Sequence, residues 1–331
     1  MLAYYFRLAL RSFSRNKVLT ALMVLAIGLG IGAAMTTLTV FTVLSGDPIP
    51  SKSDRLFYVQ LDPGTLDDYV AGQEPETQLT RFDARTLLSQ AKATRQAMMT
   101  GGGEVVSADG SALKPFISQM RYTSADFFPM FEVPMLAGQA WSASDDQDRA
   151  RVAVISRQMS EKLFGGIDSI GRDIRAAGHS LRVVGVIDDW APQPRFFDAM
   201  SSAYGQEEDI LVPISTAFDL RLGRSGTMNC FGRQVVNDPE AEPAPCTWIQ
   251  YWVELDNPGD ARAFKAYLDN YSEQQRSAGR FERPANTRLR NVMEMLDLYD
   301  VVPGDVRLQL WLAFGFLLVC LVNTVGLLLA K

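Results

Sequence analysis

The chain has 331 residues, of which 47% are hydrophobic and 21% charged, and its formal net charge is −6. Leaving out the four cations of residues 1–17 and Lys331 gives −11 for residues 18–330. This negative charge argues against nucleic-acid binding, which depends on neutralising phosphates. The single histidine, His179, excludes histidine-rich metal sites. We therefore expect no nucleic-acid partner and no bound metal.

The first 17 residues are a basic flank that contains Arg7, Arg11, Arg15 and Lys17 and no acidic residue. Positive charge beside a membrane helix favours the cytoplasmic side, so we expect a cytoplasmic N-terminus. The three arginines recur every four residues, which groups them on one helical face and leaves another face to apolar residues. This pattern predicts an interfacial helix over 1–17 in contact with membrane lipid, with a plain basic flank as the alternative.

A long uncharged segment follows, from Val18 to Gly46. About 20 predominantly apolar residues suffice to cross a bilayer, so the segment predicts a transmembrane helix over 18–45. Gly28, Gly30 and Ala33 fit the dinucleotide motif G-x-G-x-x-A, but the apolar run continues past them and no second strand follows. A cleaved signal peptide is also a poorer interpretation, because its apolar core would be only about 7–15 residues long.

Two glycines of this segment have the spacing of a packing motif. Gly28 and Gly32 form G-x-x-x-G, a smooth patch on which the backbones of two helices can approach closely. We expect the patch to contact a second helix, which the sequence does not identify. The alternative is that the glycines reflect only the high frequency of glycine in membrane helices.

The C-terminal end mirrors the first segment. Residues from Leu308 to Ala330 carry no formal charge, and Lys331 follows them. They predict a second transmembrane helix over 308–331, which returns the chain to the cytoplasm. Asn323 lies within this run, and it either faces another helix or reaches the membrane interface. Two spans leave residues 46–307 outside the cytoplasm.

The central region reads as mixed α and β, so the predicted fold class is α+β with two transmembrane helices flanking a large domain. Ser156 is a predicted N-cap and Gly165 a predicted stop for the helix between them. The segment "TGGGE" at 100–104 is predicted to be a loop. The remaining expected elements are strands at Arg151–Ser156, 181–189 and Thr247–Leu255, and a helix that opens at Pro258 with Phe264, Tyr267, Leu268 and Tyr271 on one face.

The three cysteines fit an oxidising compartment. Cys230 and Cys246 bracket a segment rich in proline, asparagine and glycine that has little else to order it. We predict a disulfide between them, which would close a loop of about 17 residues and contribute roughly 3 kcal/mol. Two free thiols are the alternative. Cys320 lies in the second apolar segment and is expected to be a small apolar filler.

Catalytic motifs are missing from the sequence. It contains no G-x-x-x-x-G-K-[ST], so the chain does not bind ATP through a P-loop, and neither H-E-x-x-H nor G-x-S-x-G occurs. S-x-x-K occurs three times without the S-D-N or K-T-G that accompanies it in serine enzymes. The acidic clusters at 145–148 and 207–209 lack the spacing of a calcium loop. We predict no catalytic, cofactor-binding or metal-binding residues, and no enzyme.

Several segments are similar to a known family. "TSADFFPMFEVPMLAGQAW" (123–141) and "VAVISRQMSEKLFGGIDSIGRDI" (152–174) resemble the MacB-like periplasmic core domain, and "LRVVGVIDD" and "ILVPISTAF" continue the resemblance. The opening "FRLALRSFSRNKVLTALMVLAIGLGIGAAM" and the closing "CLVNTVGLLLAK" resemble two membrane helices of FtsX-like ABC permeases. The chain departs from the family at 168–171, where Asp-Ser-Ile-Gly replaces the usual Asn-Pro-Ile-Gly.

The resemblance implies a permease subunit in a bacterial inner membrane, with its main domain in the periplasm. Its implied partners are a separate ABC ATPase subunit, a second copy or a paired permease, and a periplasmic partner protein. In such proteins the long helices carry ATP-driven movement to the outer domain, and the substrates include macrolides, peptides and lipoproteins.

Family members continue into a cytoplasmic coupling segment and two further membrane helices. Because this chain ends at Lys331, we expect either a fragment of a longer permease or a half-protein. For a half-protein, the alternative function is a membrane-anchored periplasmic interaction or regulatory module without transport activity.

Overall fold

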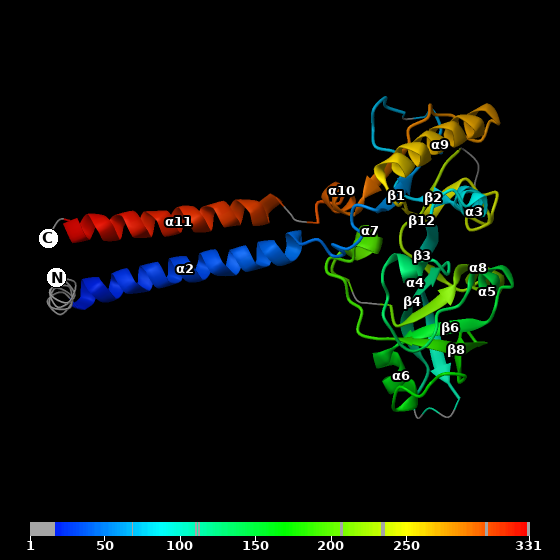
Figure 1. Ribbon diagram of the computed structural model, residues 1–331, viewed down its shortest axis with the longest axis horizontal. Coiled ribbons are helices and arrows are strands. Elements are labelled where there is room, and N and C mark those ends of the chain that lie inside the picture. The colour runs from blue at the N-terminus through cyan, green and yellow to red at the C-terminus, as the bar shows by residue number, and fades with distance from the viewer. Residues whose placement is uncertain are drawn as a thin grey trace. The chain divides into compact units, whose positions relative to one another are not determined.

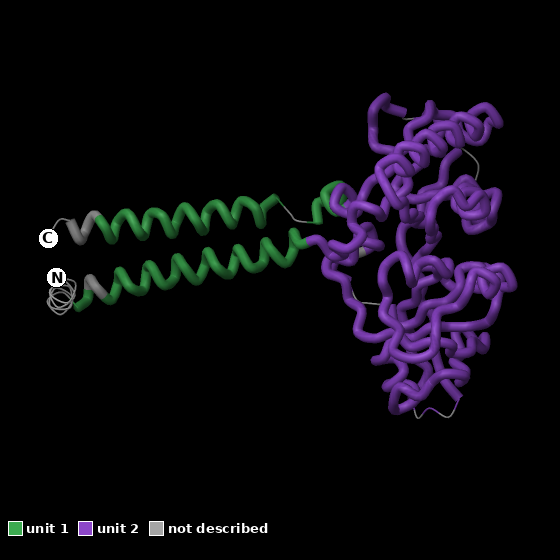
Figure 2. Tube along the Cα trace, viewed as in Figure 1, with its two compact units in different colours: residues 1–46, 296–331 green, residues 47–295 purple. Residues whose placement is uncertain are grey.

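The computed structural model describes residues 17–329 except 68, 110, 112, 206–207, 233–235 and 302–303. The chain divides into two compact units, residues 1–46 with 296–331 and residues 47–295, coloured green and purple in Figure 2. The predicted interfacial helix, with Arg7, Arg11 and Arg15, lies outside the described residues, and so does Lys331. Lys17 is exposed and is the first residue of the first described helix.

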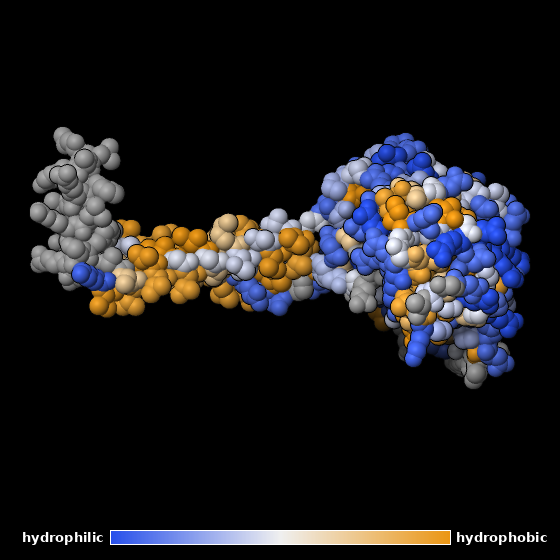
Figure 3. All heavy atoms as spheres, turned by 90° about the horizontal axis from the view of Figure 1, so that it is seen from below, coloured by the Kyte–Doolittle hydropathy of each residue, from blue (hydrophilic) through white to orange (hydrophobic). Residues whose placement is uncertain are grey.

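The first unit contains two long helices, α2 (Lys17–Ser45) and α11 (Gly304–Leu329), which lie side by side in Figure 1. Each is long and apolar enough to cross a membrane, and most of its surface is not covered by protein, as the orange spheres along the pair show in Figure 3. α11 begins four residues before the predicted start at 308, because its first turn includes the charged Asp305 and Arg307. A search for uncharged residues misses such a turn.

The two helices contact each other along one stripe of each. The half-buried and buried positions are spaced alternately by three and four residues, as in a left-handed coiled coil. On α2 they include Met23, Ile27, Gly30, Ala34, Thr37 and Phe41, and on α11 they are Val306, Leu310, Ala313, Leu317, Cys320 and Thr324. This spacing makes α2 and α11 one packed pair.

The second unit is built on a 13-stranded sheet, mostly antiparallel, with parallel pairing of β4 with β9 and of β6 with β8. The longest strand, β3, runs through its centre. The strands follow the order β13 (Arg288–Asn291), β1 (Leu56–Gln60), β12 (Cys246–Glu254), β3 (Arg95–Ala108), β4 (Phe116–Thr123), β9 (Ile210–Pro213), β6 (Val152–Ser156), β8 (His179–Ile187) and β5 (Met135–Gly138). Four short strands pair off this path, β2 (Leu79–Thr80), β7 (Asp173–Ala176), β10 (Arg224–Ser225) and β11 (Asn229–Cys230).

Short helices and one long helix cover the sheet. In the long helix, α9 (Pro258–Ser277), three residues of the predicted stripe, Phe264, Leu268 and Tyr271, are buried, and the fourth, Tyr267, is half-buried. Asn257 caps the first turn of this helix. The other helices are α3 (Arg81–Gln90), α4 (Phe127–Met130), α5 (Ala143–Gln147), α6 (Arg157–Phe164), the 3-10 turn η1 (Phe196–Asp198), α7 (Ala199–Ser202), α8 (Ile214–Leu220) and α10 (Val292–Leu298). The α+β prediction is therefore confirmed.

The local predictions around α6 are also confirmed. The Ser156 hydroxyl accepts a hydrogen bond from the amide of Met159, and Gly165 ends the helix with a φ of 78°. The serine that replaces the family's proline, Ser169, is fully buried, and its hydroxyl accepts a hydrogen bond of 2.9 Å from Ser160. A hydroxyl pair therefore accommodates the change at this turn.

The loop predicted at 100–104 is wrong. These residues lie within β3, where Gly101, Gly102 and Gly103 pair with β4. Glycine in a strand can mark a place where another group approaches the backbone closely. A Cβ at Gly102 would lie 2.3 Å from the ring of Tyr122, so a side chain there would displace that ring.

Candidate functional site

The glycine that packs α2 against α11 is Gly30. A Cβ added to it would lie 3.3 Å from Leu317 Cδ1 and 3.6 Å from Leu317 Cα. At Gly28 and Gly32 no described atom lies within 4 Å of an added Cβ, so these two glycines do not face α11. Asn323 is also exposed, outside the stripe that faces α2. Packing of these three residues against a further helix stays a prediction.

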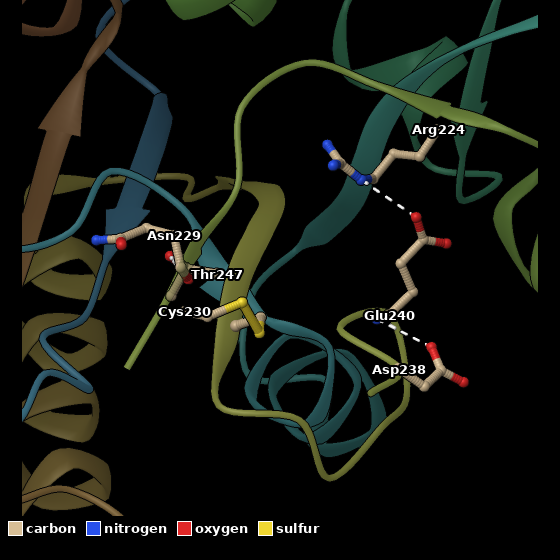
Figure 4. Close-up of a disulfide and its surroundings, with 7 residues drawn as sticks. Arg224, Asn229, Cys230, Asp238, Glu240 and Thr247 are labelled. Atoms are coloured by element: carbon tan, nitrogen blue, oxygen red, sulfur yellow. Dashed lines mark hydrogen bonds and ion pairs between the residues drawn. A yellow bond between two sulfur atoms is a disulfide. The ribbon is translucent and has the colours of Figure 1, made fainter. Parts of the chain in front are cut away.

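The predicted disulfide is confirmed. Cys230 of β11 and Cys246 of β12 are direct cross-strand neighbours, and their sulfur atoms are 2.01 Å apart (Figure 4). Cys246 is buried in the core, whereas Cys230 is exposed. Cys320 is a free thiol on the α11 stripe that contacts α2, as expected for a small filler.

The disulfide closes a loop between Cys230 and Cys246 that makes further contacts with the domain. The amide of Phe231 donates to the carbonyl of Pro245 at 2.9 Å, which extends the pairing of β11 and β12 by one step. Farther along the loop, Glu240 forms an ion pair of 3.4 Å with Arg224, and its amide donates to Asp238 (Figure 4). The loop is therefore held by backbone pairing beside the disulfide and by the ion pair of Glu240 with Arg224.

A cluster of buried charges surrounds Arg121 of β4. Arg121 of β4 is 1% exposed, and its guanidinium donates to Asp198, to Glu208 at 2.5 Å and to Gln250 at 3.0 Å. Arg195 also pairs with Glu208. Burial opposes ionisation of Asp198, but the charge of Arg121 and the hydrogen bonds from Arg121, Ser201 and Gln250 together outweigh it and lower the pKa of this carboxyl. Two positive and two negative charges thus satisfy one another away from water.

This charge cluster borders a cavity of about 340 Å³. Trp190 stacks on Phe197 at its wall, with ring centroids 5.1 Å apart, and Asp188, Asp189 and Asp209 add acidic groups. Ser156 donates to Asp209 at 2.9 Å, and the same hydroxyl accepts the capping hydrogen bond from the amide of Met159. Among the described residues, no group of three or more possible ligands gathers for a metal. Acidic and aromatic side chains therefore line this cavity, with Arg121 and Arg195 of the charge cluster among them.

Comparison with known proteins assigns the chain to a family. The family model of the MacB-like periplasmic core domain matches residues 20–271. The chain belongs to this family. Because the match begins within α2, the first apolar helix and the domain that follows it belong to one family unit.

Individual relatives are distant. The macrolide export ATP-binding/permease protein MacB of Chlorobaculum tepidum is 24% identical over 221 residues, which cover 65% of this chain and 32% of that protein. The pyoverdine export ATP-binding/permease protein PvdT of Pseudomonas savastanoi pv. phaseolicola is 26% identical over 231 residues, 68% of this chain and 31% of that protein. The chain therefore spans about a third of the length of the curated relatives that it matches.

Among solved structures, the periplasmic region of MacB from Actinobacillus actinomycetemcomitans aligns with a TM-score of 0.47 and 14% identity, over 78% of this chain and 97% of that one. The family match confirms the predicted MacB/FtsX-like permease family. With two apolar helices and a MacB-like periplasmic core domain, the chain is a membrane protein with an extracytoplasmic domain. The buried charge cluster and the cavity that it borders were not expected from the sequence.

Proposed function

We propose that the chain is a permease subunit of an ABC transporter of the MacB type, which transmits movement from a separate ATPase to its extracytoplasmic domain. The observation that carries the proposal is the family match, which includes most of α2 together with most of the domain. Relatives that share this region are named as export ATP-binding/permease proteins. The membrane is proposed to be the bacterial inner membrane, with a cytoplasmic N-terminus.

The packing of the helix pair supports this role. Leu317 fills the space beside Gly30, so the two helices pack closely at this level. A displacement at the cytoplasmic ends is then shared by both helices. Where α2 ends, Asp47 accepts hydrogen bonds from the amide of Ile49 and the hydroxyl of Ser53, which fixes the turn that enters the domain.

Further permease partners are part of the proposal. Gly28, Gly32 and Asn323 are free to contact the helix of a second copy or of a paired permease. Outside the membrane, a periplasmic partner protein would contact the domain. Because the family handles several kinds of substrate, the substrate of this chain has to be identified by transport assays.

The test reconstitutes the full chain in lipid nanodiscs with an ABC ATPase encoded beside it. We expect co-purification and a higher rate of ATP hydrolysis than the ATPase has alone. Gly30→Leu should reduce this stimulation by forcing α2 from α11, whereas Ala33→Leu introduces the same side chain at an exposed position and should not. An ATPase that neither binds the chain nor responds to it would instead favour the anchored interaction module.

Topology is tested separately. Reporter fusions at Ala140 and at Lys331 should report opposite compartments, with the fusion at Ala140 outside the cytoplasm. Equal signals from the two positions would contradict the two-span arrangement.

A further inference from the structure

A second cavity, of about 420 Å³, lies beside the disulfide-closed loop and shares no lining residue with the first. Three arginines line it, Arg81 at the start of α3, Arg221 at the end of α8 and Arg224 of β10. Its aromatic lining comes from Tyr122, Phe218 and Trp248. The loop contributes the two acidic residues of the lining, Asp238 and Glu240.

The glycines of β3 give this cavity its shape. Because Gly102 has no side chain, the ring of Tyr122 lies against the backbone of β3, where its hydroxyl donates to the carbonyl of Gly223 at 3.1 Å. Thr100, two residues earlier on β3, is 3% exposed and also lines the cavity. Of the run "TGGGE", Thr100 thus lines the cavity, and Gly102 leaves room for the ring of Tyr122, which also lines it.

The positive charge of the cavity is only partly neutralised. Arg224 has the carboxylate of Glu240 at 3.4 Å. Arg81 donates to the backbone carbonyl of Glu240 at 2.9 Å, and its Nε is buried without an acceptor among the described atoms. The carboxylates of Asp238, Glu240 and Glu242 interact with its charge from a longer distance. Arg221 is exposed at the rim, and no carboxylate of the described residues lies within 4 Å of it. Among the described residues, neither Arg81 nor Arg221 thus forms a direct ion pair within 4 Å.

A buried hydrogen-bond donor in the cavity wall also indicates a ligand with an acceptor oxygen. Trp248 is 1% exposed, and its indole N–H has no acceptor among the described atoms. A buried donor without an acceptor costs about 1–3 kcal/mol, which a ligand oxygen would recover. Phe218 packs edge-on against the Trp248 ring with centroids 5.7 Å apart, and the guanidinium of Arg81 lies 4.0 Å above the Phe218 ring. Flat apolar surface and unsatisfied donors thus meet in one cavity.

We propose that this cavity binds a small organic anion with a flat apolar body, such as an aromatic carboxylate. The carboxylate would accept hydrogen bonds from Arg81, Arg221 and the indole of Trp248. The aromatic body would pack against the rings of Phe218 and Tyr122. Inorganic phosphate has the charge but not the body, so it would leave the aromatic lining without a contact.

The test uses the full chain in lipid nanodiscs and 4-hydroxybenzoate, with 4-hydroxybenzamide as its neutral counterpart. Ligand-observed NMR should show binding of the acid that is about tenfold stronger than that of the amide, because hydrogen bonds to a charged group contribute more. Arg81→Gln and Trp248→Phe should each weaken binding of the acid several-fold. Phosphate at the same concentration should not displace it.

The matched control is Arg172→Gln. Arg172 lies 4.0 Å above the ring of Phe164, the same geometry as Arg81 over Phe218, but it lines neither cavity. This variant should bind the acid like the parent. If Arg81→Gln does not fold, Arg221→Gln at the exposed rim replaces it. Equal binding of acid and amide, displacement by phosphate, or unchanged binding in the arginine variants would overturn the proposal.

Discussion

Replacing Asp146 with asparagine should change how the stability of the domain depends on pH. Asp146 belongs to α5, which begins with a capping box between Ser142 and Asp145. Its carboxylate turns inward, and Oδ2 accepts a hydrogen bond of 2.7 Å from the amide of Ala125. Burial raises the pKa of this carboxyl from 3.8 to about 7, although the Ala125 bond opposes the shift. The folded domain therefore holds this proton to a higher pH than the unfolded chain does.

The sign and size of the pH effect on stability follow from this difference in pKa between the folded and unfolded chain. Because the unfolded chain releases the proton first, the contribution of Asp146 to stability is greatest below about pH 4 and falls as the pH rises to about 7. At about 1.36 kcal/mol per pH unit, full ionisation would cost about 4 kcal/mol. Asp146 keeps partial contact with water, which screens part of this cost. We expect a loss of about 2 kcal/mol between pH 5 and pH 8.

Chemical unfolding of the full chain, followed by tryptophan fluorescence at pH 5 and pH 8, measures the effect. Asp146→Asn keeps an oxygen for the Ala125 amide and removes the titrating proton, so its advantage over the parent should grow by about 2 kcal/mol between the two pH values. Asp148→Asn removes an exposed carboxylate at the C-cap of the same helix and serves as the control. Parallel stability curves for the parent and Asp146→Asn would refute the reasoning.

Two further predictions concern the second unit. Gly102→Ala should lower the free energy of unfolding by about 1–3 kcal/mol, because the new Cβ meets the Tyr122 ring at 2.3 Å, whereas at Gly103 the nearest atom is 3.8 Å away and alanine should fit. Equal denaturation midpoints for the two variants would contradict this steric account. Replacing Cys230 and Cys246 together with serine should cost about 3 kcal/mol, measured by chemical unfolding without reductant. A variant as stable as the parent would mean that other contacts hold the loop.

The elements that the sequence predicts well are those whose signals are local. The strand before α6, the cap at Ser156 and the stop at Gly165 all lie within residues 152–165, and each acts on its own neighbours. The stripe of α9 follows from helical spacing alone. Both apolar helices are recognised by length and composition, which require no knowledge of what they contact.

Sites made by distant residues could not be predicted in this way. The glycines at 101–103 look like a loop because the group that requires them, the ring of Tyr122, comes from the next strand. Arg121 reaches Gln250 across 129 positions of sequence, and the segment that carries Asp198 and Glu208 lies between them. The sequence around a single arginine in a strand does not indicate such distant partners. Only the strand order, with β4 two places from β12, brings them together.

The helix pair shows the same division between local and distant information. The spacing of its apolar positions indicates a stripe on each helix, but three glycines lie within one turn and a half of α2, and any of them could have been the contact. The choice of Gly30 depends on the register with Leu317, which α2 alone does not contain. Gly28 and Gly32 are then left with no neighbour from α11, in a membrane where packing rather than hydrophobicity drives helix association. A G-x-x-x-G motif that the chain does not use internally is thus available for contacts with another permease helix.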